Sequence, residues 1–157
     1  MARTVLLMRH AKSSWADDSL SDHDRPLNGR GRRDAPRMAQ HLVDAGLVPT
    51  RIVVSSAKRT RETVERMMDT LGGAEILVEP ALYLASPATI KEIVETQMAE
   101  CSPVMVVGHN PGMEMVVSSV AQALIPFPTA CVAHLHFEPG QPPQMRNVWR
   151  PKELPAL

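Results

Sequence analysis

The chain has 157 residues, of which 44% are hydrophobic and 22% are charged, as in an ordinary globular protein with one sizeable core. Seventeen lysines and arginines balance seventeen aspartates and glutamates, so there is no overall basic field to attract a nucleic acid. Aromatic residues make up only 3%, which leaves few side chains for stacking bases, and we expect no nucleic-acid partner.

Apolar runs and apolar residues at helical spacing alternate along the chain. The runs predict strands at 4–8, 51–54, 76–78, 104–107, 130–137 and 145–149, the last as an edge strand. Stripes at 35–43 and 64–71, each followed by glycine, predict two helices, and Pro36 should kink the first or mark its effective start.

A third helix is predicted over 87–100. A fourth should begin with Asn110 as the N-cap and Pro111 as the first helical residue, with apolar residues through Leu124 turned inward. The alternation is typical of an α/β layer fold. We expect one domain over 1–150 and a loose tail over 151–157.

Membrane and secretion signals are not evident. No run approaches the roughly 20 apolar residues of a membrane-spanning helix, and the apolar run before Arg9 is too short for a signal peptide. Cys101 and Cys131 form neither a metal-type spacing nor a disulfide framework. We therefore expect a cytoplasmic protein without a membrane partner, and the oligomeric state stays open.

Three predicted strands are followed directly by groups that can bind phosphate. Arg9 and His10 follow the first strand, the segment 55–63 follows the second, and the segment 108–112 follows the strand at 104–107. Ligands of open α/β sheets bind at the carboxyl ends of the strands, and helix N-termini attract anions. These segments therefore predict one anion site.

The residue types suit phosphoryl transfer. A neutral imidazole is nucleophilic near pH 7, because its ordinary pKa is about 6.5. Arginine binds phosphate oxygens in pairs, and a second imidazole can hold another oxygen as charge develops there. No cluster of histidine and carboxylates at metal-ligand spacing is evident, so we expect neither a metal nor another cofactor.

The segments 7–13, 24–31, 55–63 and 107–112 resemble, in order, the motifs of the histidine phosphatase superfamily, and are most similar to its small SixA-like phosphohistidine phosphatase branch. The resemblance implies a three-layer, phosphoglycerate mutase-like sandwich with a mixed, mostly parallel sheet. It also implies that His10 is the phosphorylated nucleophile, that Arg9 and Arg59 clamp the phosphate, and that His109 is the second histidine. We add Ser13 and Asn110 to the residues that bind substrate.

The resemblance leaves the proton donor unassigned. Mutase-like relatives have a glutamate where Leu82 and Tyr83 stand here, and acid-phosphatase-like relatives have an aspartate where Asn110 stands. Glu79, Asp22 and Asp24 are the remaining candidates. A missing acid costs about 10²–10⁴-fold on substrates whose leaving group must be protonated. We therefore hypothesise a labile phosphoryl donor such as phosphohistidine.

Other interpretations stay open. The chain could be a phosphatase or mutase of small phosphoesters, or a non-catalytic module that binds phosphate or a phosphoprotein. In each case we expect the protein to act on or bind a phosphorylated protein or a small phosphorylated substrate. His23, His41, His134 and His136 belong to no motif, and we expect them at the surface.

Overall fold

A sheet of six strands runs through the centre of the computed structural model, which describes residues 1–155. The strands are β1 (Arg3–Arg9), β2 (Arg51–Val54), β3 (Glu75–Val78), β4 (Val104–Gly108), β5 (Val132–Phe137) and β6 (Gln144–Trp149), in the order β3-β2-β4-β1-β5-β6. Neighbours from β3 to β1 are parallel, whereas β5 is antiparallel to β1 and to β6. All six predicted strands are confirmed, with β6 at an edge.

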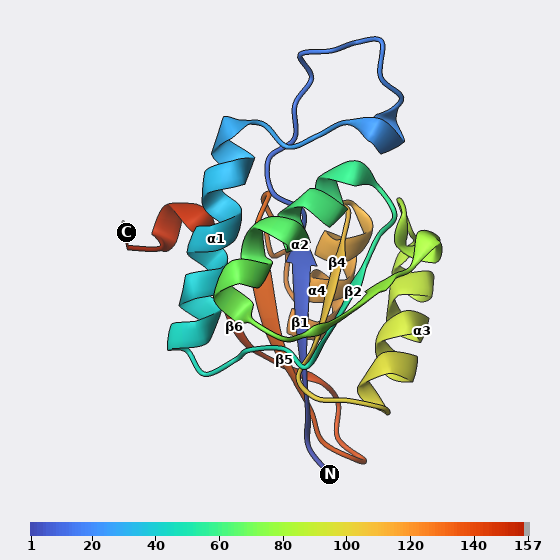
Figure 1. The fold of residues 1–157 in the computed structure, drawn as a ribbon. Helices are drawn as coiled ribbons and strands as arrows, with labels where there is room; N and C mark the ends of the chain where they lie inside the picture. Colours follow the sequence, from blue (N-terminus) through green and yellow to red (C-terminus); the bar gives the residue numbers. More distant parts are fainter. Residues whose placement is uncertain (156–157) are drawn as a thin grey trace.

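Helices cover both faces of this sheet (Figure 1). The helices α1 (Gly29–Asp44) and α2 (Lys58–Leu71) pack on one face, and α3 (Pro87–Met98) and α4 (Gly112–Ala121) on the other. Alternate side chains of β1 serve the two sides: Leu6 and Met8 contact the first pair of helices, and Leu7 the second. The predicted three-layer α/β sandwich with a mixed sheet is thus confirmed.

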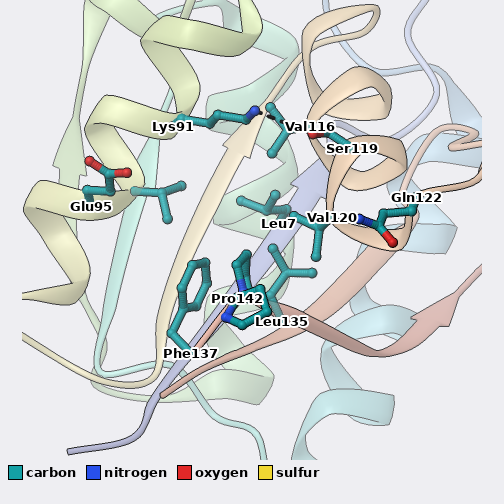
Figure 2. A pocket seen from close by; sticks show the side chains of 12 residues that line it. Leu7, Lys91, Glu95, Val116, Ser119, Val120, Gln122, Leu135, Phe137 and Pro142 are labelled. Atoms are coloured by element: carbon teal, nitrogen blue, oxygen red, sulfur yellow. Dashed lines mark hydrogen bonds between the residues drawn. The ribbon is translucent and has the colours of Figure 1, made fainter. Parts of the chain in front are cut away.

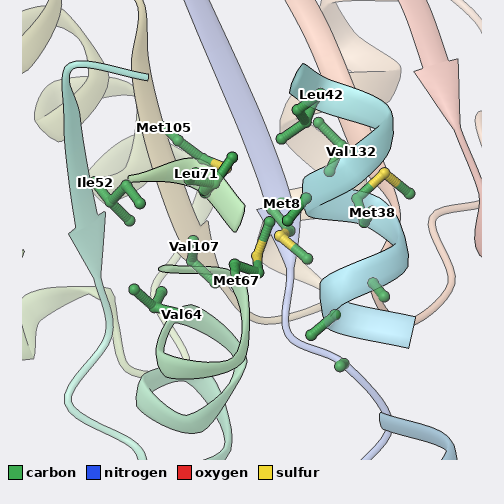
Figure 3. Close-up of a cluster of buried hydrophobic side chains, with 14 of the residues drawn as sticks. Met8, Met38, Leu42, Ile52, Val64, Met67, Leu71, Met105, Val107 and Val132 are labelled. Atoms are coloured by element: carbon green, nitrogen blue, oxygen red, sulfur yellow. The ribbon is translucent and has the colours of Figure 1, made fainter. Parts of the chain in front are cut away.

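Methionine fills much of the core between the sheet and α1 and α2 (Figure 3). Met8, Met38, Met67 and Met105 are all fully buried there. Their flexible thioethers fill irregular gaps in a protein with few aromatic rings. This packing lies against β1, which ends at Arg9.

Two helix starts differ from the prediction. The helix α1 begins at Gly29 rather than near Pro36, because the Asn28 side chain caps it by accepting from Gly31 N. The helix α4 has Pro111 as its N-cap residue, while the Asn110 side chain accepts from Glu114 N. The helix ends at Ala121, so Leu124 lies beyond it and is 94% exposed; the inward placement was wrong.

The C-terminal segment is attached to α1. A 3-10 turn, η3 (Pro151–Glu153), follows β6, and Arg37 donates to the carbonyl oxygens of Pro151 and Leu154. The predicted loose tail is therefore tied down as far as Leu154, and positions 156–157 lie outside the described residues. Over residues 1–155, no helix is long and apolar enough to cross a membrane.

Candidate functional site

The phosphate-binding groups predicted from the sequence meet at one edge of the sheet. Arg9 ends β1 and His10 follows it, Ser55 follows β2, and His109 follows β4. Because these parallel strands are neighbours, their carboxyl ends lie together. Arg59 comes from the first turn of α2. The loop after β1 arches over this edge at the top of Figure 1.

A pocket of about 270 Å³ opens at this edge. All six residues that we assigned to catalysis or substrate binding line it: Arg9, His10, Ser13, Arg59, His109 and Asn110. The ring centroids of His10 and His109 are 5.3 Å apart. Side chains from three separate segments, the end of β1 (Arg9 and His10), the first turn of α2 (Arg59) and the end of β4 (His109), therefore converge on one pocket.

The hydrogen bond of His10 defines which ring nitrogen is free. Its Nδ1 lies 2.7 Å from the carbonyl oxygen of Ala11, which can only accept, so Nδ1 donates. Burial lowers the pKa of His10 to about 3, and the ring is therefore neutral at pH 7. A neutral ring protonated on Nδ1 carries its lone pair on Nε2, which leaves that nitrogen unprotonated.

His109 is buried beside it and is also neutral. Burial first, and then the charge of Arg59, lower the pKa of His109 to about 3. Its Nε2 lies 2.7 Å from the Ser55 hydroxyl, which fixes the ring plane. Within residues 1–155, Nδ1 has no hydrogen-bond partner although it is buried.

Two guanidinium groups, of the half-buried Arg9 and the buried Arg59, line the pocket together with the histidines. The Nε atoms of Arg9 and Arg59 are both buried without a hydrogen-bond partner among the described residues. Buried polar groups are nearly always paired, so donors in this state are suited to an incoming anion. The main chain of Arg9 is fixed by the carbonyl of Cys131, and that of His10 by the carbonyl of Gly108.

Asp22 occupies part of the same pocket. Arg59 donates from Nη1 to the Asp22 carbonyl (2.7 Å) and from Nη2 to its carboxylate (3.1 Å). The same carboxylate accepts from Arg25 and from the Tyr83 hydroxyl. The hydrogen bond from Tyr83, aided by Arg59, lowers the pKa of Asp22 to about 2. Asp22 is therefore ionised and holds no proton to donate at neutral pH.

The other acid candidates lie away from the pocket lining. The Glu79 side chain accepts from Ala81 N at the start of the short turn η2 (Pro80–Leu82). Asp24, in the turn η1 (Asp22–Asp24), is 64% exposed and lies beside His23. Neither residue lines the pocket that contains the two histidines.

Ser13 and Asn110 line the pocket with their polar groups already engaged. Ser13 Oγ accepts from Arg25 at 2.7 Å. The Asn110 amide donates to the carbonyl of Phe127, and its oxygen accepts from Glu114 N. Both residues thus organise the loops around the pocket.

Sequence reasoning missed several residues that line the pocket: Lys12, Trp15, Arg25, Leu84 and Thr129. Lys12 and Arg25 stand inside the family-like segments 7–13 and 24–31, so the sequence contained a signal for both. Trp15 and Leu84 had no comparable signal. The prediction that His23, His41, His134 and His136 lie at the surface was also inexact, because all four are half-buried. His23 lies 2.9 Å from Ser56 Oγ.

A larger pocket, of about 420 Å³, lies elsewhere, between α3, α4 and β5 (Figure 2). Leu7, Val116 and Leu135 form part of its mostly apolar wall, and Lys91 and Ser119 stand at its polar side. It contains neither histidine nor arginine. Size therefore does not identify the site of phosphate chemistry; the smaller pocket has the required groups.

Comparison with known proteins identifies the family. The model of the histidine phosphatase superfamily (branch 1) matches residues 5–83. An uncharacterized chloroplastic protein of Arabidopsis thaliana is 36% identical over 145 residues, which are 86% of this chain and 66% of the relative, so the chain spans just under two thirds of it. An uncharacterized protein of Mycobacterium tuberculosis is 35% identical over 73% of this chain and 72% of its own.

Solved structures have the same fold. A protein assigned as the phosphohistidine phosphatase SixA of Agrobacterium tumefaciens has a TM-score of 0.83 and 30% identity, covering 94% of this chain and 98% of its own. A protein histidine phosphatase SixA complexed with tungstate has a TM-score of 0.85 and 22% identity, covering 95% and 97%. The second likeness concerns the fold alone.

Proposed function

Because the chain belongs to the histidine phosphatase superfamily, we propose that it hydrolyses phosphoryl groups through a covalent intermediate on Nε2 of His10. The hydrogen bond from His10 Nδ1 to the Ala11 carbonyl supports this most directly. It leaves the lone pair of Nε2 free, and burial keeps that nitrogen unprotonated at neutral pH. A nucleophile in this state needs no separate base.

In the first step, Nε2 of His10 attacks phosphorus and the bond to the leaving group breaks, with its electron pair going to that group. The unpartnered Nε atoms of Arg9 and Arg59 support a role in binding the phosphoryl oxygens. His109 would contribute a ring N–H to a further oxygen. In the second step, a water oxygen attacks phosphorus and the bond from phosphorus to Nε2 breaks, with its electron pair returning to Nε2. The proton that water loses goes to solvent, inorganic phosphate leaves, and His10 is neutral again.

The pocket favours a substrate whose leaving group needs little help. Asp22 is ionised, and Glu79 and Asp24 lie outside the pocket lining. An alkoxide leaves poorly without a proton donor, whereas an imidazole protonated on its other nitrogen leaves as a neutral molecule. We therefore propose phosphohistidine, carried by a protein, as the substrate class. The printed name of the Agrobacterium structure, a phosphohistidine phosphatase, points in the same direction.

Rapid-quench trapping tests the intermediate. The protein is mixed with radiolabelled phosphoramidate and quenched in alkali. We expect acid-labile, base-stable label on the protein, absent from His10→Ala. His136→Ala is the matched control. His136 lies on β5, pairs with Glu138 and is outside the pocket lining. Label that persists in His10→Ala would contradict the proposal, and bound phosphate without label or turnover would favour a binding module.

Substrate comparison tests the leaving-group argument. Turnover of a phosphohistidine peptide and of an aryl phosphate should exceed that of a sugar phosphate by at least about 10²-fold, the usual contribution of a general acid. A preference for the sugar phosphate would mean that a proton donor operates, and would revive the phosphoester alternative.

A further inference from the structure

Two large apolar side chains stand exposed at the mouth of the phosphate pocket. Trp15 is 71% exposed and Leu84 is 55% exposed, and both line the pocket that contains His10. They come from different parts of the chain, the loop after β1 and the segment after η2. Both therefore offer apolar surface to whatever enters or covers the pocket, and exposed apolar surface at a pocket favours contact with a partner.

Trp15 is held in position rather than left free. The Arg25 guanidinium carbon lies 3.5 Å from the centroid of the Trp15 ring. Arg25 itself is buried, and donates to Ser13 Oγ and to the carboxylate of Asp22. The indole therefore rests on a fixed cationic plane. A preorganised aromatic side chain binds at lower entropic cost than a mobile one.

Leu84 is held in a backbone conformation that its side chain does not favour. Its φ is +48°, in the left-handed region, which leucine rarely adopts. The residues before and after it are fixed, because the Tyr83 hydroxyl bonds to Asp22 and Ala85 N donates to Leu82 O. Such conformations persist only where the surroundings impose them, and they concentrate at binding sites.

Resting on the proposed function, we propose that Trp15 and Leu84 form an apolar rim that binds the residues flanking a phosphorylated side chain on a protein. The substrate class is then a phosphorylated protein segment with apolar neighbours. The pocket itself takes the phosphoryl group and the side chain that carries it. The exposed side chains of the rim can contact residues next to the phosphorylated one. A small phosphoester lacks such residues.

The experiment compares two phosphohistidine peptides that differ only in the flanking residues, leucine in one and serine in the other. For the unaltered protein we expect the KM for the leucine peptide to be about tenfold lower, the ratio that one well-packed side chain gives. Trp15→Ala and Leu84→Gly should each bring the ratio of the two KM values toward one. The second variant leaves the contact between Arg25 and Trp15 intact, and glycine accepts the φ of +48°.

Leu124→Ala, at an exposed leucine outside the pocket lining, is the control and should keep the ratio of the unaltered protein. If both rim variants retain the ratio of KM values of the unaltered protein, the proposal is overturned. It is also overturned if the variants lose as much kcat/KM on a small aryl phosphate as on the leucine peptide. Turnover of phosphoramidate by the unaltered protein reports separately on the proposed function. If there is no turnover, the dissociation constants of His10→Ala for the two peptides replace the KM values. Their ratio then tests the rim in the same way.

Discussion

Acidification should destabilise this protein through the histidines of the pocket. His10 is only 6% exposed, and burial lowers its pKa to about 3. In the unfolded chain the same ring titrates near its ordinary value of about 6.5. As the pH falls below about 6.5, the unfolded state binds a proton that the folded state refuses. The neutral ring therefore contributes fully to the free energy of unfolding above about pH 6.5. This contribution is lost progressively as the pH falls to about 3.

The size of the loss follows from those two pKa values. Between pH 7 and pH 5 the unfolded imidazole becomes mostly protonated, while the folded ring stays neutral. For His10 alone, this proton linkage lowers the free energy of unfolding by about 2 kcal/mol. Asp22 changes the free energy of unfolding little between pH 7 and pH 5. Its pKa is lowered to about 2, so its carboxylate is ionised over this interval in the folded protein and nearly so in the unfolded chain.

Urea unfolding at pH 7 and at pH 5, followed by circular dichroism, measures the loss. His10→Gln removes the titrating ring and keeps a donor for the Ala11 carbonyl. Between the two pH values the unaltered protein should lose about 2 kcal/mol more than this variant, or about 1 M in the urea midpoint. Equal losses would show that His10 accepts a proton when folded, and that its Nε2 is not free at pH 5.

Three further substitutions test the site and its supports. Arg59→Lys should lower kcat/KM for phosphoramidate by about 10²–10³-fold with unchanged circular dichroism, because lysine lacks the planar fork; a normal rate would remove Arg59 from the clamp. Asp22→Asn should lower turnover of phosphoramidate and of an alkyl phosphate alike, within about tenfold, since Arg59 loses its counter-ion. A loss confined to the alkyl ester would make Asp22 the proton donor. Gly112→Ala should lower the free energy of unfolding by about 1–3 kcal/mol, as its Cβ would lie 2.3 Å from Ala85 O, whereas Gly73→Ala has open space and should change it little.

The sheet and most of the site could be predicted from the sequence, since both depend on local patterns. Apolar runs such as 104–107 form strands, and a strand followed by His109 places that ring at the carboxyl edge. The family motifs then identified Arg9, His10 and Arg59, and all of them line one pocket.

The rest depends on contacts between distant residues, which periodicity does not encode. The pairing of Asp22 with Arg59 joins η1 to α2, and it removes a candidate acid that the sequence left open. Leu124 continued an apolar stripe, but Gln122 adopts a left-handed conformation that ends the helix before it. Trp15 in a polar loop gave no hint that Arg25 would fix its ring.

The order of strands also has a consequence for how activity arises. β1 lies between β4 and β5, so Met8 pairs with Val107 on one side and with Val132 on the other, both far along the chain. Such distant pairings close late, because a long loop must lose its freedom before they form. Enzymatic turnover should accordingly recover only with the complete sheet during refolding, and a partly assembled chain should be inert toward phosphate compounds.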